Sequence, residues 1–234
     1  MAEGNLKGEF LIAHSALLHQ FGRIPAALAA ANQAVALFER PTGSLSSRKR
    51  ENLARALVNR AHLYITRGGW EQAGDDAGRA AAIYNRLIAN GREELRGSRA
   101  QAVLFRAEAL MRAGAIAAGL EDYRDGLRTL SDLSQEWAFE SDILVVYLQR
   151  ATDAVAALVQ HGSTEAFNVL TELLTKLEEI GTRTENPEAI TANAHQSLVA
   201  LNKLLPDIGK DAGSRERLQG LTSHCGMPPI GPDA

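Results

Sequence analysis

The sequence has 234 residues, of which 45% are apolar and only 5% aromatic, and its 25 basic and 28 acidic side chains give a formal net charge of -3. This balance excludes a general binder of nucleic acid or anionic membrane, which needs a clustered excess of positive charge. No apolar run approaches the roughly 20 residues of a membrane-spanning helix, so we expect no membrane insertion. The lone cysteine, Cys225, cannot form an internal disulfide and favours a reducing, cytoplasmic setting.

The predicted elements are all helical, because alanine and leucine dominate the apolar residues and favour helices over strands. Apolar residues recur at three- and four-residue steps, as amphipathic helices require. The helices are expected at about 5–20, 24–39, 47–67, 70–89, 98–113, 116–132, 141–160, 164–180 and 187–205. Ser47 and Ser98 are the expected N-caps of their helices. Polar links, including residues 131–136, are expected to join successive helix pairs.

An internal repeat organises these helices. Gly22, Gly68 and Gly114 follow one another at intervals of 46 residues, and other positions keep their size class in the same register. Two such columns are Ala27, Ala73 and Gly119, and Phe38, Tyr84 and Leu130. Small residues where helices cross and large ones at their ends are typical of stacked helical hairpins. We therefore predict three hairpins that turn at the glycines, and a weaker fourth copy that turns at Gly162.

The clearest copy lies between residues 56 and 84. Leu57, Ala61 and Tyr64 share one face of its first helix, and a turn follows at Gly68-Gly69. The second helix then places on one face Trp70, Ala73, Ala77, Ala80 and Tyr84. This order resembles the signature of the tetratricopeptide repeat (TPR). The resemblance covers about residues 9–180 and implies a right-handed α-solenoid of antiparallel helix pairs that binds proteins.

The repeat length departs from that family, because the usual repeat has about 34 residues. We expect the added residues to lengthen helices and links and so to change the pitch of the solenoid. The expected organisation is a helical repeat domain at 1–205 followed by a short helix and a Gly/Pro-rich tail at 206–234. Within the domain the repeats span about 5–45, 46–91, 92–136 and 137–182, and residues 187–205 form a capping helix.

In TPR proteins the first helix of each pair lines the concave groove, so the resemblance implies solvent-facing, partner-binding residues there. The candidates are His19, Arg55, Asn59, His62, Gln101, Glu108, Met111 and Arg112. A mixed, near-neutral groove suits an extended peptide or a docking helix. Asn59 matches one asparagine of the clamp by which some TPR domains hold a C-terminal carboxylate, but the other clamp residues are missing. Asn59 is therefore either a ligand contact or a partner in a hydrogen bond within the repeat.

No residue set combines a nucleophile, a base and an orienting group, so no enzyme, catalytic residue or cofactor is predicted. The histidines lack metal-ligand spacing, so we expect no metal site. The run Arg48-Lys49-Arg50 is either a solvated helix start or a patch that binds nucleic acid or phosphate. Three hypotheses of function remain open. The chain is a scaffold or adaptor for a partner protein or peptide, a ligand-gated peptide-sensing regulator, or a self-assembling scaffold that forms homo-oligomers.

Overall fold

The computed structural model describes residues 2–40, 46–136, 140–163, 165–166, 168–169 and 171–172. The chain divides into two compact units, residues 1–129 and 130–234, and the division falls inside helix α6. The described residues of both units are almost entirely helical. The predicted capping helix at 187–205 and the segment at 206–234 lie outside the described residues.

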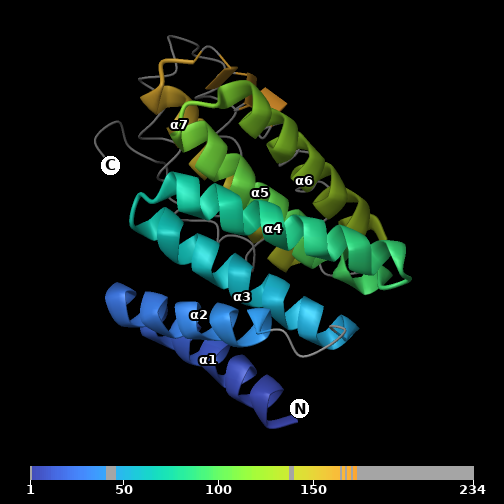
Figure 1. The fold of residues 1–234 in the computed structure, drawn as a ribbon. Coiled ribbons are helices and arrows are strands. Elements are labelled where there is room, and N and C mark those ends of the chain that lie inside the picture. The colour runs from blue at the N-terminus through green and yellow to red at the C-terminus, as the bar shows by residue number, and fades with distance from the viewer. Residues whose placement is uncertain are drawn as a thin grey trace. The chain divides into compact units, whose positions relative to one another are not determined.

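Successive antiparallel hairpins build the first unit (Figure 1). Each first helix contacts the second helix of its own pair, and α3 and α5 also contact the second helix of the preceding pair. The chain is an α-solenoid, as the sequence predicts. Its elements are α1 (Ala2–Gln20), α2 (Ile24–Glu39), α3 (Ser47–Thr66), α4 (Trp70–Ala89), the 3-10 turn η1 (Glu93–Leu95), α5 (Arg96–Arg112), α6 (Ile116–Glu136) and α7 (Glu140–Gln160).

Each hairpin turns at a glycine in the left-handed region. The φ angles are 69° at Gly22, 74° at Gly68 and 86° at Gly114. In each turn the amide after the glycine donates to a carbonyl in the last turn of the helix, as Gly69 does to Tyr64 at 2.8 Å. This closure satisfies carbonyls that a helix end leaves unpaired. Gly162, the predicted fourth turn, has a φ of 61° and follows α7 in the same way.

Small residues form the crossing of α3 with α4, as predicted. Ala61 and Ala77 are completely buried, which lets the two backbones approach closely. Large side chains fill the space beside this crossing, because Leu57 is 0% and Tyr84 1% exposed. Burial raises the pKa of Tyr84 to about 12. The core of the first unit lies between the helices, in one cluster that spans α1 to α5 and a smaller one formed by α2 and Leu63 of α3.

Two predicted N-caps and one predicted link are wrong. Ser46 caps α3, since its hydroxyl accepts from the amide of Lys49 at 3.3 Å, and Ser47 is already helical. Ser98 lies inside α5, because η1 leads directly into that helix and starts it at Arg96. Residues 131–136 continue α6, since they contain no Gly or Pro to end it.

Candidate interaction surface

The first helices lie next to one another, because α3 contacts both α1 and α5 (Figure 1). Each of them starts a hairpin, so all three run in the same direction. Their shared side gathers the predicted partner-binding positions, and we call it the first-helix face. Its members that are not buried are Glu9, His19, Arg55, Asn59, His62, Thr66, Gln101 and Arg112.

Three rings meet on the first-helix face. The ring of His19 on α1 packs edge-on against His62 on α3, with centroids 4.7 Å apart. His62 in turn stacks on Phe105 of α5, with centroids 5.1 Å apart and planes 18° apart. Thr66 Oγ1 lies 3.4 Å from His19 Nε2. Two predicted site residues are thus brought together, and Phe105 extends their contact across three helices.

A polar latch joins α1 to α3 further along the first-helix face. One carboxylate oxygen of Glu9 accepts from Asn52 Nδ2 at 2.9 Å and from Arg48 at 3.1 Å. These hydrogen bonds hold the pKa of Glu9 below its usual range, with that from Asn52 the larger cause. Lys49 Nζ donates to the carbonyl of Arg40 at 2.7 Å. Two cations of the basic run are therefore engaged in fastening the start of α3.

Asn59 carries an unusual side chain for this face. Its Nδ2 is buried and makes no hydrogen bond with any residue that the structure describes. Arg55 and His62, four residues before it and three after it, place Asn59 in the same helical stripe. A buried amide without a partner costs about 1–3 kcal/mol. The hydrogen bond within the repeat that the sequence left open is not made by this nitrogen.

The third repeat presents a different surface from the one expected. Met111 is 1% and Glu108 6% exposed, whereas both were expected to face solvent. Glycine on α6 explains Met111, because a Cβ at Gly119 would lie 2.5 Å from Met111 Cγ. The longer side chain fills the space that the glycine leaves. Gln101 remains exposed.

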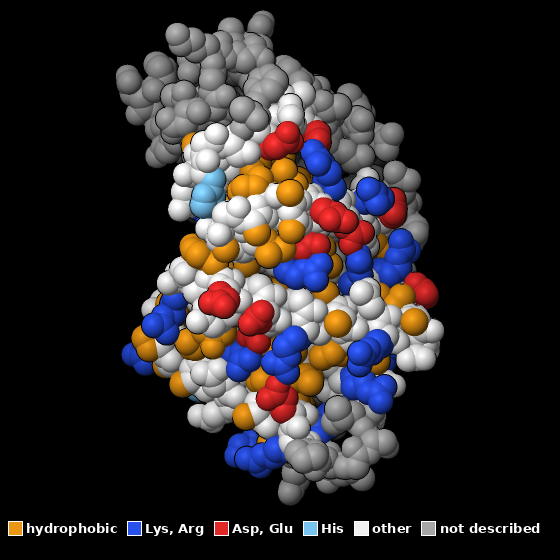
Figure 2. All heavy atoms as spheres, turned by 45° about the horizontal axis from the view of Figure 1, so that its top comes forward, with side chains coloured by type: hydrophobic (Ala, Val, Ile, Leu, Met, Phe, Trp, Pro, Cys, Tyr) orange, Lys and Arg blue, Asp and Glu red, His pale blue; other side chains and the backbone are white. Residues whose placement is uncertain are grey.

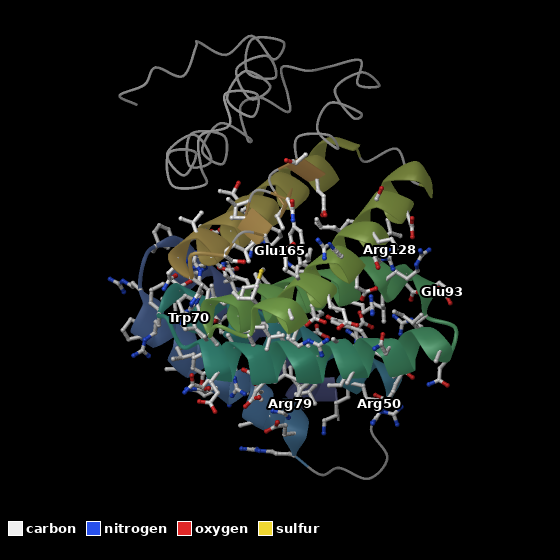
Figure 3. All side chains as sticks on the ribbon, turned by 90° about the horizontal axis from the view of Figure 1, so that it is seen from above. Arg50, Trp70, Arg79, Glu93, Arg128 and Glu165 are labelled. Carbon is white, nitrogen blue, oxygen red and sulfur yellow. The ribbon has the colours of Figure 1, made fainter. Side chains whose placement is uncertain are left out.

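Arg112 marks the end of the first-helix face. Its guanidinium lies 5.7 Å from the ring centroid of Trp70, within the range of a cation-π contact. Trp70 begins α4 and Glu93 lies beyond the far end of that helix (Figure 3). The contact therefore joins the last turn of α5 to the first turn of α4.

Ion pairs fix the first helices to the second helices. Arg60 of α3 binds both carboxylate oxygens of Asp76 on α4, at 2.6 and 2.8 Å. Arg106 of α5 binds Asp122 on α6 in the same way, at 2.5 and 2.6 Å. The carboxylates raise the pKa of both arginines. The sequence analysis missed these pairs, although each residue of the second pair follows its counterpart by 46 positions.

A separate groove of about 590 Å³ lies between α4 and α5. Gly74 and Ala109 are among the residues that line it, and its rim carries Asp75, Arg79 and Arg106. Both arginines are already paired with carboxylates. On the face shown in Figure 2, basic and acidic side chains are interspersed rather than gathered by sign. The groove therefore presents no concentrated charge to a ligand.

Within the described part of the chain, no three His, Cys, Asp or Glu side chains are placed to hold a metal ion. Of the helices that the structure describes, none combines the length and the apolar character needed to cross a membrane. The first-helix face carries rings, amides and charged side chains.

No protein-family model matches the chain, and no curated protein matches it. Solved structures do match. Crystal structures of the nearly identical TPR-like repeats ascribed to a Podosopora anserina kinesin light chain, one of them a variant, superpose with TM-scores of 0.62 and 0.60. Each of the two is 16% identical to this chain, and each alignment covers 96% of this chain. The alignments cover 96% of the first crystallised chain and 97% of the second. At this identity the likeness shows the fold alone, and the fold is that of TPR-like repeat proteins, as residues 56–84 predict.

Proposed function

We propose that the chain is a non-catalytic protein-interaction scaffold whose first-helix face binds an extended peptide segment of a partner protein. The observation that carries this proposal is the buried amide of Asn59, which has no hydrogen-bond acceptor among the described residues. Asn59 as a residue is only half-buried, so a rotation of its side chain would bring this donor to the main-chain carbonyl of a bound peptide. Its pairing would recover about 1–3 kcal/mol of otherwise uncompensated desolvation.

The neighbours of Asn59 suit the rest of such a ligand. The rings of His19 and His62 offer a half-buried contact for an apolar or aromatic side chain. Arg55 of α3 and Gln101 of α5 are exposed and provide polar anchors. A half-apolar centre with a polar rim is the usual anatomy of an interface that binds a peptide.

The ion pairs support a preformed site. Arg60 with Asp76 and Arg106 with Asp122 hold α3 and α5 against their second helices. A face whose helices are fixed before binding loses less entropy when a ligand docks. The free energy of binding therefore depends on contacts made by a few side chains, and little of it is lost in ordering the scaffold.

The test replaces Asn59 with leucine, which keeps the number and branching of the side-chain heavy atoms and removes the amide. We expect Asn59→Leu to weaken binding by roughly tenfold or more, because one buried hydrogen bond is lost. Its free energy of unfolding should stay unchanged or rise, because the unpaired donor is gone. Gln33→Leu, at an exposed position of α2 outside the first-helix face, is the control. Peptides selected from a random 12-residue display library on the wild-type chain serve as probes, and calorimetry measures their affinity.

Two results would contradict the proposal. The first is that the selected peptides bind the Asn59→Leu variant as tightly as they bind the wild type. The other is a fall of more than about 1 kcal/mol in the stability of that variant, which would assign Asn59 a structural hydrogen bond. Affinity purification from the native extract with the same variants then identifies the natural partner.

A further inference from the structure

Helix α1 is apolar on two opposite sides. Leu11 packs into the core on one side. All large apolar side chains that are exposed within the described residues lie on the other side or, in the case of Phe21, in the turn directly after α1, with exposures of 70% at Leu6, 64% at Phe10, 50% at Leu17 and 73% at Phe21. Steps of three and four residues align them along the helix. Together with Ala13 and His14, which are exposed on the same side, they form the outer stripe, which consists of Leu6, Phe10, Ala13, His14, Leu17 and Phe21.

We propose that the outer stripe is a homodimer interface, in which α1 packs antiparallel against α1 of a second copy. A two-fold interface requires a patch that is complementary to itself. The outer stripe meets this condition, because its spacing reads the same in both directions about a centre between Ala13 and His14. In the antiparallel pair Leu6 lies opposite Phe21 of the second copy, and Phe10 lies opposite Leu17. Every large side chain therefore meets a large apolar partner.

The charge of the outer stripe and the area that it can bury are consistent with a second copy of α1 as its partner. The outer stripe contains no formally charged residue, and the flanking Lys7 lies opposite Gln20 of the second copy, so no like charges meet. The ring of His14 stacks on Phe10, with centroids 5.7 Å apart, and so lies flat within the outer stripe. Aromatic side chains bury roughly 150 Å² or more each, so two copies approach the ~1,000 Å² that a specific interface needs.

Sedimentation equilibrium of the full chain tests the proposal between roughly 1 and 100 µM, a range suited to an interface of this size. We expect the apparent mass of the wild type to double over this range. The Phe10→Glu/Leu17→Glu variant should keep the mass of a monomer, and its circular dichroism spectrum should equal that of the wild type. Ala29→Glu/Gln33→Glu places the same charges on the exposed side of α2 and should dimerise like the wild type. A wild type that stays monomeric, or a Phe10→Glu/Leu17→Glu variant that dimerises equally, would overturn the proposal.

Cross-linking tests the antiparallel arrangement in a chain with Cys225→Ser. A cysteine in place of His14 lies at the two-fold axis and should form a disulfide between copies on mild oxidation. A cysteine in place of Leu6 should not link to itself, because the two copies of that position are about 22 Å apart along the helices. It should link when mixed with Phe21→Cys. Self-linking of Leu6→Cys without linking to Phe21→Cys indicates a parallel pair and contradicts the inference.

Discussion

At the scale of single residues, the two repeated ion pairs differ in burial. The side chains of Arg60 and Asp76 are 17% and 5% exposed, whereas those of Arg106 and Asp122 are 39% and 13% exposed. Removal of one partner from a buried pair leaves an uncompensated charge, which costs about 3–5 kcal/mol, and solvent reduces this cost. We expect Asp76→Ala to destabilise the chain by about 3 kcal/mol and Asp122→Ala by less. Urea denaturation compares them, and equal losses would show that burial does not set the cost.

The polar latch makes a prediction about pH. The native pKa of Glu9 is lowered, so its stabilising effect is present above the ordinary glutamate value of about 4.3 and is lost as the pH falls through the native pKa. Asn52→Leu should move the pKa of Glu9 up towards that value, and Arg48→Gln should move it by less, because Asn52 is the larger cause. NMR titration of the Glu9 carboxyl carbon measures both shifts. A larger pKa shift in Arg48→Gln than in Asn52→Leu would show that Arg48 is the main cause of the lowered pKa of Glu9.

At the scale of elements, two helical glycines should respond oppositely to alanine. A Cβ at Gly119 would lie 2.9 Å from the carbonyl oxygen of Ala107, which is backbone and cannot move aside, so Gly119→Ala should cost about 1–3 kcal/mol. A Cβ at Gly74 meets only Ala109 Cβ at 3.8 Å. Gly74→Ala should therefore stabilise α4 by about 0.5–1 kcal/mol. Thermal unfolding distinguishes them, and the same sign for both would contradict the described packing of α5 against α6.

The crossing of α3 with α4 provides a second test of element packing. Ala77 is completely buried where these helices meet. Ala77→Leu should force the helices apart and cost about 1–3 kcal/mol. Ala82→Leu, at an exposed position of the same helix, is the control and should change stability little. If Ala77→Leu left the free energy of unfolding unchanged, the crossing of α3 with α4 would have room for the larger side chain.

The sequence predicted the helices best where a glycine turn precedes them. The observed bounds of α2 and α4 equal the predicted ones, because Gly22 and Gly68 end one helix and Ile24 or Trp70 starts the next. The end of α6 was misplaced, since a polar composition at 131–136 does not by itself stop a helix. Local sequence signals thus predicted the glycine turns well. They predicted helix ends that lack a glycine poorly.

The candidate surface was predictable only in part. Periodicity placed His19 and His62 on one side of their helices, and the structure brings their rings together. It could not place Phe105 on the same stack, because the rotation of one repeat against the next is not encoded in the spacing within a helix. It also assigned Met111 to the groove by assuming identical repeats. Glycine at position 119 opens the seam of the third repeat and draws that side chain inwards.

At the scale of the whole molecule, the solenoid of the first unit couples only neighbours. Helix α1 contacts α2 and α3, whereas α3 contacts α1, α2, α4 and α5. Stability in such a stack is a sum of terms within and between adjacent repeats. A defect in α1 should therefore remain local, and a defect in α3 should spread in both directions.

Two leucines test this coupling by hydrogen exchange. Leu11 on α1 is 8% exposed and Leu57 on α3 is 0% exposed, so replacing either with alanine should cost about 2–5 kcal/mol locally. Leu11→Ala should speed exchange in α1 and α2 and leave α4 and α5 protected. Leu57→Ala should speed exchange from α1 to α5, because α3 is the element that all of them share. Uniform acceleration by Leu11→Ala would mean instead that the first unit opens as one cooperative body, with no independent first repeat.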